Sequence, residues 1–295
     1  MLDVLNSGRV LVADGATGTM LQAEGLPVGL PGEAWVLERP DVIVKLHRAY
    51  LDAGSDLILT TTFGGTRPRL ARARLDDRVP EINRRAAELA REAVQAGTYA
   101  GRDVGPFVGG DVGPTGEMMP PLGKLTYQGA VDLFAEQIGA LAAGGVDCIW
   151  IETMSALEEA RAAIDAARQV TDLPVFCTFS FDTHGRTSMG LSPSQAAAAV
   201  AELGAVGTGA NCGHAPEEVL DFLPRVGEAA PGLYLVAKPN AGIPRMVGRQ
   251  AVYDADPERL AALARQYVDL GAHIVGACCG SSPAHIAAIA AMVGE

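Results

Sequence analysis

The stretch Ile274-Val275-Gly276-Ala277-Cys278-Cys279-Gly280-Ser281-Ser282-Pro283 contains the end of one secondary-structure element and the start of another. Its first half, Ile274–Cys278, is a short apolar run that is typical of a buried strand. Ser282-Pro283 indicates a helix start, because serine caps the first turn and proline fits inside it. A helical pattern then covers Ala284–Val293. The stretch therefore predicts a strand followed by a helix, with two adjacent cysteines where the strand ends.

This strand-then-helix pattern recurs about eight times along the chain. The predicted strands are Val10–Ala13, Leu57–Thr62, Phe107–Gly110, Cys148–Glu152, Val175–Ser180, Val206–Asn211, Leu233–Lys238 and Ile274–Cys278. The predicted helices are Asp41–Ala53, Glu81–Ala96, Tyr127–Ala143, Leu157–Val170, Ser194–Leu203, Glu217–Ala229, Pro257–Leu270 and Ala284–Val293. Strands that alternate with helices imply a parallel sheet, and eight such units favour a closed (β/α)8 TIM barrel over an open sheet. No linker or low-complexity tract divides the chain, so we expect one domain over residues 1–295.

Composition excludes several classes of protein. The formal net charge of −12 argues against a nucleic-acid partner and against an anionic membrane surface, because both need a basic face. No apolar run is long enough to span a membrane, and the N-terminus has no signal-peptide pattern. Five cysteines without a disulfide-framework spacing suit a reducing compartment. We therefore expect a cytoplasmic protein.

Three cysteines stand at predicted strand ends. Cys212 ends the sixth strand, Cys278 and Cys279 end the eighth, and Asn240 follows the seventh. In a barrel of this kind the carboxyl ends of the strands carry the chemistry, so these residues should meet at one rim. Three thiolates can hold Zn²⁺ and leave a fourth position for a substrate. The alternative is that two of these three are buried, inert core cysteines and the third is an exposed thiol. We interpret the two other cysteines, at 148 and 177, as packing residues inside apolar strands.

Two carboxylates are predicted at the same rim. Asp14 ends the first strand within a glycine-rich segment, and Glu152 ends the fourth. Together they can bind the ammonium group of an amino acid, or they can act as a general acid and base. They can also simply cap the helices that follow.

In combination, five motifs resemble the homocysteine S-methyltransferase family over nearly the whole chain. The motifs are Asp14-Gly15-Ala16-Thr17-Gly18-Thr19, Asp111-Val112-Gly113-Pro114-Thr115-Gly116, Ile151-Glu152-Thr153-Met154, Asn211-Cys212-Gly213 and Cys278-Cys279-Gly280. Where the family has Gly-Gly-Cys-Cys-Gly, this chain has alanine at position 277. The resemblance implies that Cys212, Cys278 and Cys279 are catalytic zinc ligands, and that Asn240 can take the fourth zinc position without substrate. It also implies that homocysteine binds to Asp14, Gly15, Ala16 and Glu152.

The reaction that the resemblance implies is methyl transfer to the homocysteine thiolate, giving methionine. Zinc ligation removes the thiol proton, and an all-sulfur site suits alkyl transfer to sulfur. The stretches Thr62–Arg67 and Ser180–Thr183 look most like bacterial betaine–homocysteine methyltransferases, so we prefer betaine as the donor. A quaternary ammonium needs aromatic walls. The candidates are Trp35, Phe63, Tyr127 and Phe181.

Other interpretations stay open from the sequence. The donor can instead be S-methylmethionine, or a methyl group delivered by a separate corrinoid protein or a methylfolate system. A non-catalytic zinc-thiolate barrel, structural or sensing, is the alternative from another class of protein. The sequence leaves the oligomeric state open, and also whether selenohomocysteine or another thiol replaces homocysteine as acceptor.

Overall fold

The chain forms a ring of parallel strands in a computed structural model that describes residues 1–97, 105–182, 184–243, 245–247 and 250–294. The strands are β1 (Leu11–Val12), β2 (Leu57–Leu59), β3 (Phe107–Val112), β4 (Cys148–Met154), β5 (Val175–Phe179), β6 (Gly207–Cys212), β7 (Tyr234–Pro239) and β10 (Ala272–Val275). Their order around the ring is β1-β10-β7-β6-β5-β4-β3-β2. A parallel bridge between Ala13 and Leu57 joins β1 to β2 and closes the ring. The predicted (β/α)8 barrel is confirmed.

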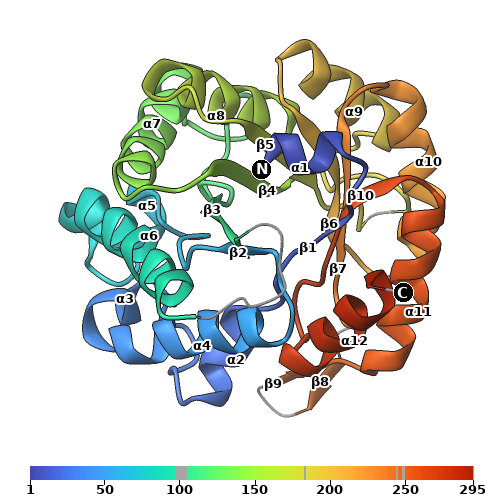
Figure 1. Cartoon of the computed structure of the whole chain (residues 1–295). Helices are drawn as coiled ribbons and strands as arrows, with labels where there is room; N and C mark the ends of the chain where they lie inside the picture. Colours follow the sequence, from blue (N-terminus) through green and yellow to red (C-terminus); the bar gives the residue numbers. More distant parts are fainter. Residues whose placement is uncertain (98–104, 183, 244, 248–249, 295) are drawn as a thin grey trace.

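Long helices cover the outside of this ring (Figure 1). They are α4 (Pro40–Asp52), α6 (Val79–Gln95), α7 (Tyr127–Ala143), α8 (Leu157–Val170), α9 (Pro193–Glu202), α10 (Glu218–Ala229), α11 (Pro257–Asp269) and α12 (Pro283–Val293). Each lies close to its predicted bounds, because proline and capping residues mark several of the starts. Within the described part of the chain, no helix has both the length and the apolar character needed to cross a membrane.

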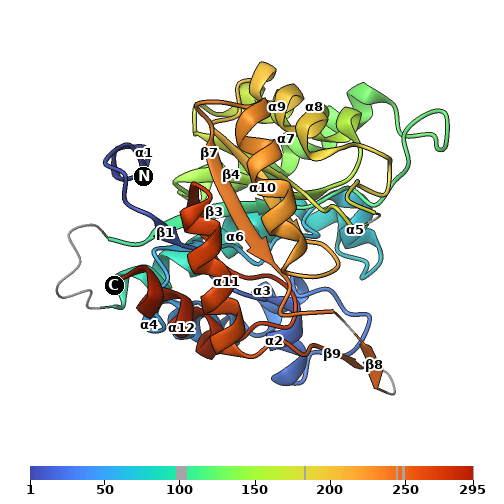
Figure 2. The ribbon, with the colours of Figure 1, turned by 90° about the vertical axis from the view of Figure 1, so that its right-hand side faces the viewer.

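Several short elements were not predicted from the sequence. They are α1 (Leu2–Asn6), α2 (Gly18–Ala23), α3 (Ala34–Glu38), α5 (Arg67–Ala71), the 3₁₀ turn η1 (Asp76–Arg78), and the antiparallel hairpin of β8 (Arg245–Val247) and β9 (Gln250–Val252). Elements of three to six residues are too short to show a hydrophobic period. Figure 2 shows α1 at one end of the barrel and the hairpin projecting at the other.

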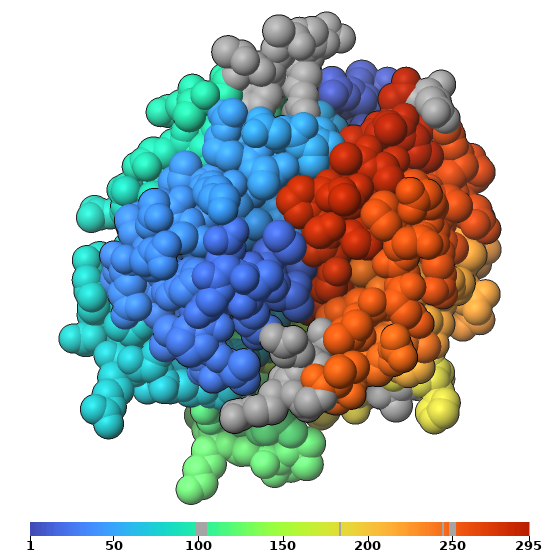
Figure 3. Space-filling model, turned by 90° about the horizontal axis from the view of Figure 1, so that it is seen from below, coloured from blue at the N-terminus to red at the C-terminus, as the bar shows by residue number. Residues whose placement is uncertain are grey.

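The core has two layers because side chains of a strand alternate between its faces. Trp150 and Phe176 stack inside the barrel, with ring centroids 5.2 Å apart. Cys148 lies in this inner cluster and Cys177 in the outer one, between strands and helices, and both are fully buried. The two cysteines interpreted as packing residues are therefore core residues. The N-terminal and C-terminal segments of the chain lie side by side (Figure 3), with β1 in contact with β10 and α12.

Candidate active site

A cavity opens at the carboxyl ends of the barrel strands. Its lining includes residues from the ends of most strands, namely Asp14, Gly15, Ala16, Phe63, Asp111, Glu152, Thr153, Cys212, Lys238, Cys278 and Cys279. These positions are far apart in the sequence, and the closed ring brings them to one mouth. This is the end at which barrels of this class carry their chemistry.

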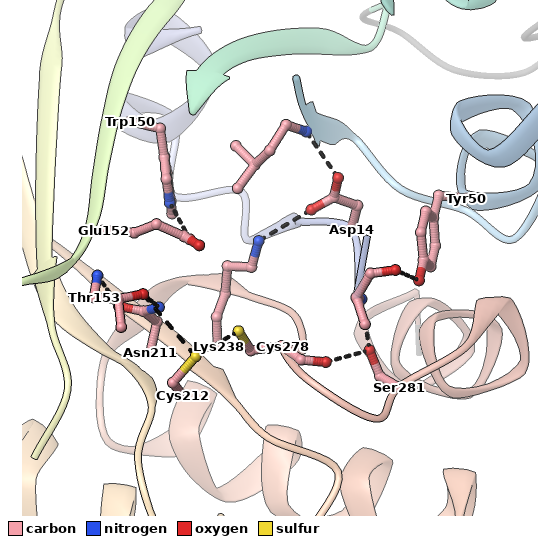
Figure 4. A network of polar contacts seen from close by, with 12 residues as sticks. Asp14, Tyr50, Trp150, Glu152, Thr153, Asn211, Cys212, Lys238, Cys278 and Ser281 are labelled. Carbon is pink, nitrogen blue, oxygen red and sulfur yellow. Dashed lines mark hydrogen bonds and ion pairs between the residues drawn. The ribbon is translucent and has the colours of Figure 1, made fainter. Parts of the chain in front are cut away.

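The three predicted cysteines come together in this cavity. The sulfur atoms of Cys212, Cys278 and Cys279 all lie within 4.8 Å of one another. Those of Cys212 and Cys278 are 2.8 Å apart (Figure 4). Three thiols at this spacing can converge on one thiophilic metal ion.

The backbone fixes the cysteine pair beside the end of β7. The amide of Cys278 donates to the carbonyl of Pro239 at 2.7 Å, and the amide of Ala241 donates to the carbonyl of Cys279 at 2.9 Å. The last barrel strand was predicted to reach Cys278, but β10 ends at Val275. At Gly276, a side chain would meet the backbone of Ala13 at 2.9 Å, so glycine permits the close approach to β1.

Asn240 follows β7, as predicted, and fits a role beside the cysteines. Its amide nitrogen donates to the carbonyl of Gly213 at 2.8 Å. Its carbonyl oxygen Oδ1 is buried and has no hydrogen-bond partner among the described residues. Buried polar atoms are normally paired, so this oxygen is available to a ligand or an ion. Its backbone amide also donates to the carbonyl of Cys212, at 3.4 Å.

Two residues at the site hold a strained backbone. Thr153 has φ of 62° and Cys212 has φ of 55°, in the left-handed region that β-branched residues rarely adopt. The side chain of Asn211 holds them together: its Oδ1 accepts from the amide of Thr153 at 2.8 Å, and its Nδ2 donates to Thr153 Oγ1 at 2.7 Å (Figure 4). Thr178 Oγ1 donates to the same Asn211 oxygen at 2.7 Å. Strain of this kind, supported by a fully bonded amide, is typical of functional sites.

A charged layer lies above the apolar filling of the barrel. In β4, Trp150 faces inward, Ile151 outward and Glu152 inward; in β7, Lys238 stands two residues beyond the inward-facing Val236. Lys238 is 2% exposed, and its ammonium lies over the Trp150 ring, 5.7 Å from the centroid. Lys238 was not among the site residues predicted from the sequence, although a lysine at the end of an apolar strand was a usable signal.

Asp14 is paired with this lysine. Its Oδ1 lies 3.0 Å from Lys238 Nζ, and its Oδ2 accepts from the amide of Leu59 at 2.8 Å. Burial alone would lower the pKa of Lys238, but the negative charges of Asp14 and Glu152 raise it above its ordinary value. The lysine therefore stays charged and neutralises part of the carboxylate charge in the cavity.

Glu152 lies in the same layer and accepts fewer hydrogen bonds than Asp14. Its Oε2 accepts from the indole nitrogen of Trp150 at 3.1 Å. Burial raises the pKa of this carboxyl to about 7, against the opposing effect of Lys238. The remaining lone pairs of Glu152 are free to accept hydrogen bonds from a bound cationic group.

The backbone at Gly15 and Ala16 is held tightly. The amide of Ala16 donates to Ser281 Oγ at 3.0 Å, and its carbonyl accepts from the Tyr50 hydroxyl at 2.7 Å. A side chain at position 15 would meet Ser281 Oγ at 2.5 Å, so the close approach requires glycine. Both predicted positions line the cavity, and the Ala16 amide already has a partner.

Of the four aromatic candidates for a donor pocket, Phe63 lines the cavity. Its ring packs against Gly113, where a side chain would come within 2.6 Å of it, and the Arg69 guanidinium lies 5.5 Å from its centroid. The others have different partners: Trp35 carries the Arg39 guanidinium 5.4 Å from its ring centroid, Tyr127 donates to Asp165 at 2.5 Å, and Phe181 packs on Phe222. These three are not among the residues that line the cavity, and their role in donor binding stays a prediction. Thr183, in one of the stretches used for the donor prediction, lies outside the described residues.

Comparison with known families agrees with this geometry. Residues 11–293 match the family model described as homocysteine S-methyltransferase. The chain belongs to the homocysteine S-methyltransferase family. Methionine synthase of Mycobacterium tuberculosis is 35% identical over an alignment 305 residues long, which covers 99% of this chain and 25% of that protein. Methionine synthase of Mycobacterium leprae is 34% identical over 97% of this chain and 24% of its own. The chain thus spans about a quarter of the length of these curated relatives.

Two solved structures of the homocysteine methyltransferase MmuM from Escherichia coli are similar over the whole barrel. The oxidised form has a TM-score of 0.84 at 25% sequence identity, and covers 98% of each chain. The metallated form has a TM-score of 0.83 at the same identity and coverage.

Proposed function

We propose that this protein transfers a methyl group from an onium donor to the sulfur of homocysteine, giving methionine, with zinc as its metal. The observation that carries the proposal is the cluster of Cys212, Cys278 and Cys279, whose sulfurs lie within 4.8 Å of one another in a family barrel. The cluster shares one cavity with the carboxylates of Asp14 and Glu152. The arrangement combines a soft-metal site with a site for an amino-acid ammonium.

The chain offers a matching donor set for zinc. Cys212, Cys278 and Cys279 would hold it, and the unpartnered Oδ1 of Asn240 is the candidate for the fourth ligand without substrate. When bound, zinc supplies a positive charge that favours the deprotonated, nucleophilic form of a substrate thiol. The structural-zinc alternative would need a permanent fourth ligand, and a neutral amide oxygen is a weak one beside three thiolates.

The charged layer then orients the amino acid. The Glu152 carboxylate accepts a hydrogen bond from the homocysteine ammonium. Asp14 is a second acceptor, through the lone pairs that its bonds to Lys238 and to the Leu59 amide do not use. Asn211 and Thr153 position Cys212 through the bonded pair described above. No proton is removed from the methyl carbon during the displacement, so these groups bind and orient rather than act as bases. Positioning of this kind supplies a large part of the rate acceleration.

Betaine is the preferred donor in this proposal. Phe63 lines the cavity, with the Arg69 guanidinium 5.5 Å from its ring centroid, and Arg69 and Arg72 supply cations for a donor carboxylate. S-methylmethionine carries both an onium centre and a carboxylate, and is the nearest alternative. A methyl group from a separate corrinoid protein is the other alternative, because the curated relatives named methionine synthase are about four times as long as this chain.

The function is tested by methionine formation and by metal removal. Zinc-replete protein should form methionine from homocysteine with betaine, tested in parallel with S-methylmethionine and methylcobalamin. A chelator should abolish that activity while circular dichroism stays unchanged, and added zinc should restore it. Unfolding of the barrel on chelation would instead indicate a structural metal. Absence of methionine with every donor would defeat the proposal.

Glu152→Gln tests the amino-acid site. A hydrogen bond to a charged group is worth about 1.5–3 kcal/mol, so the homocysteine dissociation constant should rise roughly 10- to 150-fold. Zinc content should not change. Glu33→Gln is the matched control, because Glu33 lines the same cavity but accepts from the amide of Gly64 at 2.5 Å, and it should leave homocysteine affinity intact. Equal affinities in wild type and Glu152→Gln would show that Glu152 has only a structural role.

A further inference from the structure

Asp111 is a cavity carboxylate that the proposed function does not use. In β3, Gly109 faces the inside of the barrel and Gly110 faces α7, so the alternation points Asp111 inward at the mouth. Two hydrogen bonds fix its backbone. The Asp111 amide donates to Thr60 Oγ1 at 2.9 Å, and the Asp111 carbonyl accepts from Thr62 Oγ1 at 2.7 Å. The main chain is therefore pinned while the side chain lines the cavity.

Among the described residues, the carboxylate of Asp111 forms no direct ion pair, because Lys238 pairs with Asp14 instead. It is 93% buried, given a relative exposure of 7%, and its Oδ1 has no hydrogen-bond partner among the described residues. The charges that act most on its pKa are those of Glu152, Lys238, Asp14 and Glu33, of which only Lys238 is positive. The Lys238 ammonium lies 3.0 Å from Asp14. Arg69 and Arg72 also line the cavity, where the proposed function assigns them to the donor carboxylate. Burial, with the added charge of Glu152, raises the pKa of Asp111 well above its ordinary value. A buried carboxylate in this state is stabilised strongly by any cation that enters the cavity.

The position of Asp111 in the ring separates it from the metal ligands. In the order β1-β10-β7-β6-β5-β4-β3-β2, closed from β2 to β1, strand β3 stands directly across the barrel from β7. The cysteines lie on the two neighbours of β7, at the end of β6 and after β10. A methyl donor must approach the acceptor sulfur in line, from the side of the cavity that faces the cysteine cluster. Asp111, on β3, and Phe63, in the loop after the neighbouring β2, both line the cavity.

We propose that Asp111 binds the positively charged onium group of the methyl donor and so determines the preference for cationic donors. This inference rests on the proposed function and adds a residue to its donor side. In the transfer, the bond from the methyl carbon to the onium nitrogen or sulfur breaks and its electron pair stays on that atom. The new bond forms from the homocysteine thiolate sulfur to the methyl carbon. The donor thereby loses its positive charge.

That loss of charge decides which kinetic constant Asp111 controls. A carboxylate attracts the full positive charge of the bound donor more than the partial charge of the transition state. The interaction therefore strengthens donor binding without accelerating the chemical step. Asp111→Asn should raise the donor KM about 10- to 100-fold, as for loss of one partner of a buried charge pair. Its kcat should stay equal to or slightly above that of the wild type.

The experiment compares betaine with its carbon isostere, 3,3-dimethylbutanoate, which keeps the carboxylate but lacks the onium charge. Steady-state kinetics give the KM for betaine and for S-methylmethionine, and calorimetry gives the affinities for betaine and for the isostere. Wild type should bind betaine more tightly than the isostere, and Asp111→Asn should bind the two about equally. Homocysteine KM and zinc content should not change. Asp147→Asn is the matched control, because Asp147 accepts from the amide of Val108 at 2.7 Å, at the opposite end of the barrel.

Each outcome separates this inference from the function on which it rests. A wild type that forms methionine, with Asp111→Asn unchanged in donor KM, would overturn the inference and leave the function intact. A rise in homocysteine KM instead of donor KM would also overturn it, and would assign Asp111 to the amino-acid ammonium. Turnover with methylcobalamin and with neither onium donor would overturn both this inference and the onium-donor part of the proposed function, and would leave homocysteine methylation itself intact. A wild type inactive with all three donors would defeat the proposed function itself.

Discussion

Replacing Cys278 by alanine is expected to remove the bound zinc and to lower methionine formation by roughly 1,000-fold, while the barrel stays folded. Two thiols hold zinc far less well than three. Loss of about 4 kcal/mol of charge stabilisation by a metal corresponds to that factor in rate. The fold should survive because Cys278 lies in a loop after β10 and outside both hydrophobic clusters. Metal analysis, the methionine assay and thermal unfolding are the three measurements.

Cys177→Ala provides the matched control. This thiol is fully buried between the barrel and its helices, so its removal leaves a small cavity and costs about 1 kcal/mol of stability. It should keep one zinc per chain and full activity. The two variants are thus expected to show opposite patterns, one losing metal and the other stability. A Cys278→Ala protein that retains stoichiometric zinc would sink the ligand assignment.

The meeting of the cysteines was predictable from the sequence because it depends on topology. Cys212 ends an apolar run, and Cys278 follows another. Once the repeated strand–helix unit indicates a parallel barrel, every strand end is placed at the same mouth, whatever the sequence separation. The distance of 2.8 Å between their sulfurs confirms that they meet. Their role as zinc ligands stays a prediction.

Side-chain direction was much less predictable. A strand of a barrel is apolar on both faces, so the sequence shows no alternation from which to infer which residues point inward. The inward direction of Asp111 and Lys238 follows only from their register beside Gly109 and Val236. The sequence also did not indicate which aromatic side chains reach the cavity. Phe63, in the loop after β2, lines it, whereas Tyr127, at the start of the helix after β3, does not.

Backbone strain was not predictable at all. Thr153 is β-branched and would be assigned an extended conformation from its sequence, yet its φ is 62°. The conformation depends on the Asn211 amide, which reaches it from a strand two positions away in the ring. Such a tertiary constraint leaves no local pattern in the chain.

Lys238→Met is expected to lower the free energy of unfolding by about 3–5 kcal/mol at pH 7, because it leaves a buried charge without its partner. Methionine has similar length and no charge, so the variant removes the cation and keeps most of the packing. Asp14 would lose its 3.0 Å partner, and the negative charges of Glu152 and Asp111 would lose the cation they share. Urea denaturation of both proteins measures the difference.

The pH dependence and a double variant identify the cause. The folded-state pKa of Lys238 is raised, so its stabilising effect is present in full below its ordinary value of 10.5 and is lost only above it. In Lys238→Met, Asp14 can instead become neutral by binding a proton, so the destabilisation should shrink between pH 7 and pH 5. Adding Asp14→Asn to Lys238→Met should recover much of the stability at pH 7, since neither charge is then left unpaired. A loss that is independent of pH and unchanged in the double variant would mean that Lys238 stabilises the barrel by packing on Trp150, and not by its charge.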